Sequence, residues 1–448
     1  MSEPAGRGTN APEFAMLCRR TITRSLRWVV IASVVLVILL IRGDVFTLNP
    51  AQEASSKYAF DLIGWHLSNS MSKWTHLAFR AIPGQDISDA EKLALVDEYF
   101  RLGRAENDLR NRINIVASEQ SPVAPEARRL QADIERAHRL RHAIRNDVEE
   151  TLESELSSVV RFEGMGLFGE VVFPPVDIRL IETPKVLITS PRDKIERQDG
   201  ILLDPHMSVE SREEVEASLL EDEDISALVL DIGGVATFPA SVYNGADLNG
   251  TLSIMAHEWL HHYLFLRPLG QHMFDSPDML VLNETVADLG GRELGDIAFK
   301  RIRSRMPEVV PVAFDATAEI EAEGPTQTTE FDFRREMQET RLTADALLAR
   351  DEIEIAEAYM ETRRKLFIAN GHPIRKLNQA YFAFNGTYAE SPASVNPIGG
   401  QVRRLRELSP DLGTFMSLVS GVSNYAEFLE LLSEIESADT RAEAAAGG

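Results

Sequence analysis

Residues Trp28 to Ile41 form an uncharged, apolar run of fourteen in this 448-residue chain. This run constrains the possible folds most, because so apolar a segment is not stable on a surface that faces water. Apolar side chains occupy every face of a helix built from it, which argues against a helix packed on a core by one face. The run is shorter than the roughly 20 residues that usually span a bilayer. Arg27 and Arg42 can extend it by reaching toward the lipid headgroups. The sequence therefore predicts a transmembrane anchor over residues 28–44.

Positive charge on one side of this run predicts the orientation of the anchor. Four arginines lie between residues 19 and 27, and basic residues that flank a span stay in the cytoplasm. Residues 1–27 are therefore expected to form a cytoplasmic basic arm, with the body of the chain on the other side of the cell membrane. A cleaved signal peptide is the alternative, because fourteen apolar residues also fit its central region. Arg42 and Asp44 follow the run directly and no A-x-A cleavage site is near, which favours the anchor.

The charge balance changes after the predicted anchor. The chain has 46 basic and 70 acidic residues and a net charge of −24, yet residues 1–45 carry +3 and the remainder carries −27. Because nucleic-acid binding needs basic patches that neutralise phosphates, the acidic body argues against that class of partner. Cys18 is the only cysteine, so the composition excludes a disulfide framework and a four-cysteine metal site.

Two long amphipathic segments follow the anchor. Residues 88–116 and 126–160 repeat apolar residues every three or four positions, and Ser121–Pro125 interrupts them. We expect an antiparallel helical hairpin here, so that residues 55–163 make a helical stalk. A coiled-coil arm that pairs with a second copy fits the same pattern, and the oligomeric state stays open.

Short strands replace the long helices after Gly164. Runs rich in β-branched residues predict strands at 171–173, 176–181, 185–189, 200–203, 225–232 and 235–242. From Leu252 onward the pattern is again helical. We predict an α+β lobe with a mixed sheet over residues 164–305, a helical C-terminal lobe over 306–436 and a flexible tail over 437–448. The expected fold class is α+β and predominantly helical.

The most informative segment is His257-Glu258-Trp259-Leu260-His261, which reads H-E-x-x-H. Two histidines four residues apart share one face of a helix, so both imidazoles can bind one metal ion. Glu258 lies about 100° around the helix from His257, near enough to reach a metal-bound water without being a ligand. The segment is rich in apolar residues, which predicts a buried helix and argues against histidines that merely face solvent. His262 is expected to face away from the metal.

A second motif, Asn283-Glu284-x-x-x-Asp288, begins another helical pattern. Glu284 follows His261 by 23 residues, enough chain for the first helix to end and an antiparallel helix to return. A catalytic zinc site uses three protein ligands and leaves a position for water, and His257, His261 and Glu284 supply three. Asp288 lies one turn beyond Glu284, from where it can accept a hydrogen bond from the ring of His257. We therefore predict one catalytic zinc ion at this site.

The two motifs together resemble those of the gluzincin metallopeptidases, the thermolysin-like clan. The metzincin pattern is excluded, since Leu264 and Arg267 stand where it needs Gly and His. The E-x-x-A-D-x-x-G string that ends at Gly291 is also similar to Ste24/HtpX-type membrane peptidases, and residues 377–388 are weakly similar to bacterial aminopeptidases. The close resemblance covers residues 257–291 and implies a zincin-like fold for the α+β lobe.

The resemblance also implies a mechanism. Zinc-bound water, activated by Glu258 as general base, would attack the scissile peptide bond. The oxyanion that forms needs a hydrogen-bond donor besides zinc, which gluzincins take from a downstream Tyr or His. Tyr388 is the candidate, because the turn residues Asn385–Thr387 can present its ring to a cleft, and Tyr381 and His372 are the alternatives.

An upstream edge strand normally holds the substrate backbone in such enzymes, by adding it to a sheet. The predicted strand 235–242 lies shortly before the H-E-x-x-H helix, and its Pro239 fits an edge position. Val235, Ala236 and Thr237 are therefore expected to bind substrate.

These features predict a single-pass, membrane-anchored zinc metallopeptidase that acts on a peptide or protein substrate outside the cytoplasm. One alternative is a non-catalytic receptor or scaffold that keeps a zincin fold for partner binding, although Glu258 would then have no role as a base. A zinc hydrolase acting on a non-peptide substrate is the other. No motif in the sequence encodes cleavage specificity or distinguishes endopeptidase from exopeptidase action.

Overall fold

The computed structural model describes residues 48–80, 87–119, 125–167, 169–245, 247–306 and 331–446, together with Ile31 and Ser33. The predicted basic arm lies outside the described residues. So does every residue of the predicted anchor except Ile31 and Ser33. No helix within the described ranges is long and apolar enough to cross a membrane. Residues from Pro50 onward form one compact unit.

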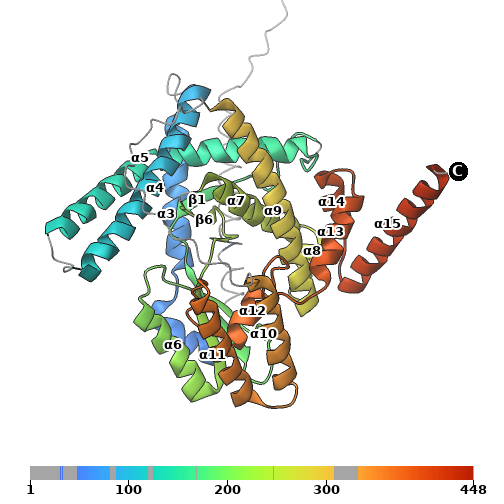
Figure 1. The fold of residues 1–448 in the computed structure, drawn as a ribbon. Coiled ribbons are helices and arrows are strands. Elements are labelled where there is room, and N and C mark those ends of the chain that lie inside the picture. Colours follow the sequence, from blue (N-terminus) through green and yellow to red (C-terminus); the bar gives the residue numbers. More distant parts are fainter. Residues whose placement is uncertain are drawn as a thin grey trace, which may run out of the picture. The chain divides into compact units, whose positions relative to one another are not determined.

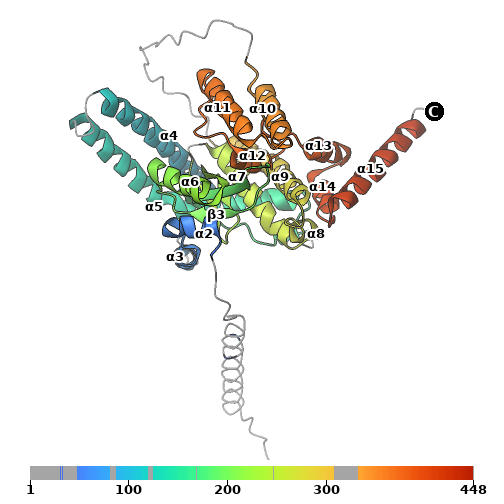
Figure 2. The same ribbon diagram turned by 90° about the horizontal axis from the view of Figure 1, so that it is seen from below.

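Helices dominate the first part of this unit. They are α2 (Pro50–Ser55), the short 3-10 helix η1 (Ser56–Tyr58), α3 (Leu62–Arg80), α4 (Asp89–Glu119) and α5 (Pro125–Phe162). Helices α4 and α5 lie side by side as the hairpin that the amphipathic pattern predicts (Figures 1 and 2).

Two small three-stranded sheets follow. In the first, β1 (Ile178–Ile181) pairs in parallel with β6 (Ala240–Tyr243), and β5 (Gly234–Val235) pairs antiparallel with the other side of β6. In the second, β2 (Lys185–Pro191) lies between β3 (Gly200–Leu203) and β4 (Ile225–Asp231), all antiparallel. Helix α6 (Val209–Glu223) packs on β4. The fold is thus predominantly helical with small mixed sheets, as the sequence predicts.

Two strand predictions need correction. The predicted strand 235–242 is interrupted, because a turn with a cis peptide bond between Phe238 and Pro239 separates β5 from β6. Residues 171–173 do not form a regular strand, since Val171 makes only an isolated bridge with Leu167. Pro239 lies inside the first segment and Pro174 directly follows the second, and proline cannot donate a ladder hydrogen bond.

The main hydrophobic core surrounds the helices that carry the two motifs. These are α7 (Leu248–Phe265) and α9 (Pro277–Arg305), joined by the short α8 (Pro268–Gln271). Asp247 caps α7 and Ser276 caps α9, each by accepting hydrogen bonds from backbone N–H groups of the first turn. The second half of α5 is buried in the same core and contacts both α7 and α9. The base of the predicted stalk is therefore part of the core.

The C-terminal helices pack in two groups. Helices α10 (Phe333–Leu348), α11 (Ile353–Ala369) and α12 (Gln379–Asn385) lie together near α6, and α12 covers β2 and β4 (Figure 1). Helices α13 (Ile398–Leu408), α14 (Leu412–Val419) and α15 (Tyr425–Ala446) instead join α9.

Helix α15 continues through the segment expected to be a flexible tail. It ends at Ala446, so residues 437–446 are helical. Arg404 of α13 lies within ion-pair distance of Glu436 and Asp439, which holds this part of α15 against its neighbour. Alanine and glutamate also favour helix over frayed coil.

Candidate metal centre

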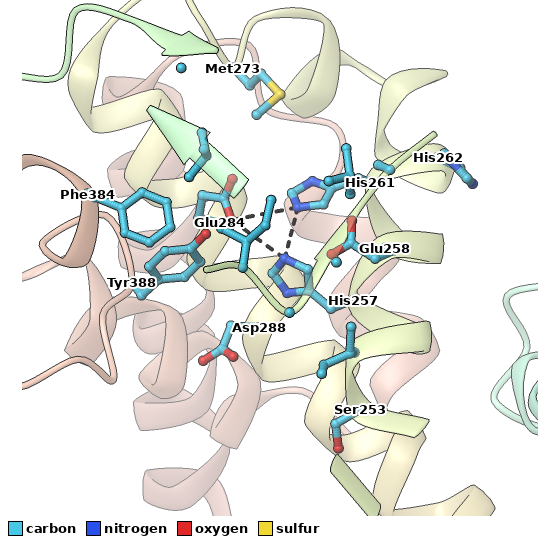
Figure 3. A pocket seen from close by; sticks show the side chains of 18 of the residues that line it. Ser253, His257, Glu258, His261, His262, Met273, Glu284, Asp288, Phe384 and Tyr388 are labelled. Carbon is cyan, nitrogen blue, oxygen red and sulfur yellow. Dashed lines mark hydrogen bonds and ion pairs between the residues drawn. The ribbon is translucent and has the colours of Figure 1, made fainter. Parts of the chain in front are cut away.

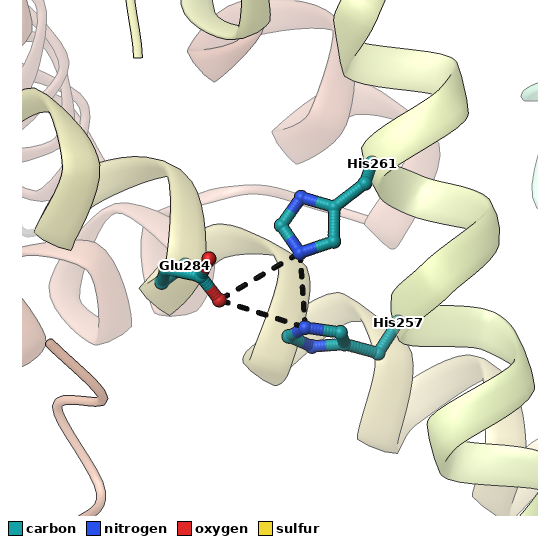
Figure 4. Close-up of side chains that lie close together, drawn as sticks. All are labelled: His257, His261 and Glu284. Atoms are coloured by element: carbon teal, nitrogen blue, oxygen red, sulfur yellow. Dashed lines mark hydrogen bonds and ion pairs between the residues drawn. The ribbon is translucent and has the colours of Figure 1, made fainter. Parts of the chain in front are cut away.

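Two helices bring the three predicted ligands together. His257 and His261 lie one turn apart on α7, and their Nε2 atoms are 3.0 Å apart. Glu284 approaches from α9, with Oε2 3.6 Å from each of those nitrogens (Figure 4). With metal–ligand bonds of about 2.0–2.1 Å, tetrahedral geometry sets ligand atoms about 3.3 Å apart. The three side chains therefore form a group that can hold one metal ion.

Glycines on α9 set the distance between the two helices. A Cβ at Gly291 would lie 2.9 Å from the backbone N and Cα of His257, and one at Gly295 would lie 2.7 Å from the backbone of Ser253. These glycines follow Glu284 by seven and eleven residues, so they share its face of the helix. The absence of a side chain at these two positions lets α9 come close enough for Glu284 to reach the histidines.

This cluster is largely buried, and one of its polar atoms has no hydrogen-bond partner. The side chains of His257, His261 and Glu284 are 17%, 15% and 11% exposed. Oε2 of Glu284 is fully buried and accepts no hydrogen bond, although an unpaired buried carboxylate oxygen is costly. A cation between the three side chains would satisfy this oxygen and both Nε2 lone pairs, so the residues present fit a bound metal.

The electrostatics of the cluster agree with a site for positive charge. Burial opposes ionisation of Glu284, but the neighbouring His261 and His257 outweigh it and lower the pKa of the carboxyl group. Burial likewise opposes the charged form of His261, but Glu284 overcomes this effect and raises the pKa of the imidazole to about 9. The carboxylate thus stays ionised and pulls positive charge toward the two Nε2 atoms.

Asn283, which the sequence analysis assigned no role, orients one of the ligands. It is fully buried, and its Oδ1 lies 3.1 Å from Nδ1 of His261. An N–H at Nδ1 donates to this oxygen, which leaves the lone pair of Nε2 free for a metal. The sequence contained a signal for this role, because Asn283 belongs to the same motif as Glu284 and directly precedes it.

Asp288 does not make the predicted hydrogen bond to His257. Its carboxylate lines the same cavity but pairs with Arg292, one turn further along α9, at 3.1–3.2 Å. Within the described residues no hydrogen bond joins Asp288 to His257. Spacing alone placed Asp288 on the correct face of the helix, but Arg292 on the same face competes for its carboxylate.

Glu258 is held against the edge strand β5. The residue is buried, and a Cβ added at Gly234 would lie 2.3 Å from its Oε1. Glycine at 234 is therefore what gives the carboxylate room. Burial raises the pKa of Glu258, although the nearby His257 and His261 oppose this change.

Of the three candidates for the oxyanion donor, only Tyr388 lines the cavity. Figure 3 shows its ring together with Phe384 on the side of Glu284, across from α7. Burial raises the pKa of the Tyr388 hydroxyl, and the charges of Glu284 and Glu258 raise it further. The hydroxyl therefore keeps its proton and remains a hydrogen-bond donor. His372 instead stacks on Phe333, and Tyr381 packs in the apolar cluster between α12 and the second sheet.

The predicted substrate-binding residues lie at the free edge of the first sheet. Val235 belongs to β5, which is the last strand of its sheet, and Val235 and Ala236 line the cavity. Thr237 does not line it, because its hydroxyl is used inside the turn, bonding to the carbonyl oxygen of Pro239 and the hydroxyl of Ser241. His262 also lines the cavity, but its ring points away from the three ligands toward Phe238 (Figure 3).

A cavity of about 990 Å³ is lined by His257, His261, Glu284, Glu258 and Tyr388. Its wall is mostly apolar and includes several partly exposed aromatic rings, among them Phe238, Phe265 and Phe274. A cavity with an apolar wall and a few converging polar groups is typical of a site for an organic ligand. Its volume lies at the upper end of the range for sites that bind organic ligands.

Comparisons with protein-family models, curated proteins and solved structures find no match for this chain. We therefore infer the function from the geometry and chemistry of the site itself.

Proposed function

We propose that this protein is a zinc-dependent metallopeptidase. The observation that carries the proposal is the combination of a three-ligand group with a buried carboxylate, Glu258, that is not a ligand. A structural metal site has no need of such a base, and structural zinc sites usually have four protein ligands. Three ligands leave one position open for chemistry.

His257, His261 and Glu284 would hold the metal. Zinc bound there supplies a Lewis acid that polarises the scissile carbonyl and makes water more acidic. Glu258 removes a proton from the attacking water and delivers it to the leaving amine, as a general base and then a general acid.

The other groups in the cavity bind and stabilise. The hydroxyl of Tyr388 donates a hydrogen bond to the oxyanion that develops on the carbonyl. The outer edge of the first sheet, at β5 and the adjoining Ala236, would accept an extended peptide as an added strand. The aromatic wall of the cavity binds apolar side chains of the substrate.

The acidic body would act on the outer side of the cell membrane, attached by the apolar run near the N-terminus. This part of the proposal comes from the sequence alone. A reporter enzyme that is active only outside the cytoplasm, fused after Gly448, should be active. Activity of a cytoplasmic reporter at the same position would overturn the topology.

The first prediction tests the peptidase activity itself. A mixed peptide library incubated with the wild-type chain should be cleaved, and Glu258→Gln should lower kcat by about 10²–10⁴-fold while zinc stays bound, because the variant lacks the base. Mass spectrometry of the products and metal analysis of both proteins measure this. Equal cleavage by the two proteins, or stoichiometric zinc without any cleavage, would exclude the proposed mechanism.

A further inference from the structure

Arg197 is a cation in the wall of the cavity whose charge no described residue neutralises. It lies in the loop between β2 and β3, and it is half-buried and lines the cavity with Phe384 and Tyr388. Its guanidinium lies 5.8 Å from the centre of the Phe384 ring and packs over Gly200, where a Cβ would collide with Nη2. Nothing in the proposed mechanism uses it.

The other charged side chains in the cavity wall all have partners. Asp231 pairs with Lys185 and Arg212, while Arg292 pairs with Asp288. The remaining two, Glu258 and Glu284, belong to the metal centre. Among the described residues, Arg197 makes no hydrogen bond and no ion pair, although the body of the chain is strongly acidic.

A free guanidinium in a partly desolvated, largely apolar cavity favours an anionic ligand. Arginine offers a planar pair of N–H donors that matches a carboxylate, and such charge-assisted pairs are stronger than neutral hydrogen bonds. Low local polarity strengthens the attraction further. The ring of Phe384 restricts the guanidinium, so less side-chain freedom is lost when a carboxylate binds.

We propose that Arg197 recognises a carboxylate of the substrate, so that the site selects peptides that place an acidic group beside Tyr388. The group is either the C-terminal carboxylate of the peptide or an acidic side chain, since both present the same chemistry. This inference rests on the proposed function for its substrate class, but it concerns binding and can be tested without cleavage.

The test measures equilibrium binding of four apolar pentapeptides to the full-length Glu258→Gln protein by calorimetry, with and without zinc. Two peptides differ only in a free or amidated C-terminus, and two differ only in a central Glu or Gln. The same titrations are made with Arg197→Gln added. Lys194→Gln is the matched control, because it removes one positive charge from the same loop at a side chain that is 54% exposed and outside the cavity wall.

We expect the acidic member of one pair to bind about tenfold or more tightly than its neutral partner. Arg197→Gln should abolish this preference, and Lys194→Gln should keep it. A preference within the first pair assigns the C-terminal carboxylate, and one within the second pair assigns a side chain. No binding, no preference, or a preference that survives Arg197→Gln overturns the proposal. If Arg197-dependent binding is found but the wild-type chain cleaves no peptide, only the peptidase proposal fails.

Discussion

Two clusters of buried charge differ in how completely they are satisfied. The first, here called the α5–β1 cluster, consists of Glu149 and Arg179 with the amides of Asn69 and Asn146. Glu149 accepts from Arg179 at 2.8 Å with one carboxylate oxygen and from the backbone N–H of Leu180 at 2.7 Å with the other. Arg179 also donates to both asparagines. Every group in this cluster has a partner within the protein.

The second cluster is the metal centre, where Glu284 has a buried oxygen without any hydrogen bond. Both clusters combine a carboxylate with cationic or potentially cationic partners, and both join elements that contribute to the main core. The difference teaches which of them is structural. A fully satisfied cluster stabilises the fold by itself, whereas the second cluster has an oxygen and two facing nitrogens that a cation could bind.

The largest expected effect on folding comes from breaking the satisfied cluster. Glu149→Ala leaves the buried guanidinium of Arg179 and the N–H of Leu180 without their partner, which should lower the free energy of unfolding by about 3–5 kcal/mol. Chemical denaturation followed by circular dichroism measures this. Glu98→Ala removes a half-exposed pair with Arg101 and should change stability by less than about 1 kcal/mol. Equal effects of the two variants would contradict the assigned role of the α5–β1 cluster.

A smaller effect is expected when the side chain that orients His261 in the metal centre is removed. Asn283→Ala removes the oxygen that orients His261, and such outer partners typically contribute 10–100-fold to metal affinity. We expect a loss of zinc affinity in the range of about 10–100-fold, measured by competition with a chelating dye. Asn378→Ala, which removes an asparagine that caps α12 away from the cavity, is the control and should leave zinc affinity unchanged. An unchanged affinity in Asn283→Ala would show that Asn283 does not position the ligand.

The smallest effect concerns a third buried carboxylate, Glu216, which joins α6 to Arg375 and Lys376. Burial opposes its ionisation, but these two cations outweigh it and lower its pKa below the ordinary 4.5. A lowered folded-state pKa stabilises the fold above the unfolded value and loses that contribution as the pH falls through the folded value. Glu216→Gln should therefore cost about 1 kcal/mol at pH 7 and progressively less below pH 4.5.

Stability against pH, compared with the exposed control Glu213→Gln on the same helix, measures this contribution. A cost that stays constant down to pH 3, or that grows with acidity, would contradict it.

The sequence predicts what local periodicity determines. His257, His261 and Glu284 each occupy a helical face that spacing alone defines, and the helices α7, α9 and the α4–α5 hairpin follow from the same patterns. The packing of α9 on α7 through Gly291 and Gly295 could not be derived, because a glycine at a helix contact looks the same in sequence as one on a surface.

Contacts between distant segments account for most of the remaining differences. The cavity position of Arg197 and the room that Gly234 leaves for Glu258 both depend on which elements meet. The pairing of Asp288 with Arg292 is instead local, because the two residues lie one turn apart on α9. Of the predicted edge strand 235–242, Val235 lies in β5 and residues 240–242 lie in β6, because the chain turns at residues 236–239.

Zinc titration of the metal-free chain tests the central claim most directly. The account predicts one tight site in the wild-type protein and in Glu149→Gln, and a loss of that site in Glu284→Gln, because a neutral amide replaces the charged ligand. The two substitutions are chemically identical and differ only in which buried cluster they alter. Absence of a tight site in the wild-type protein, or an equal affinity in Glu284→Gln, would contradict the metal centre.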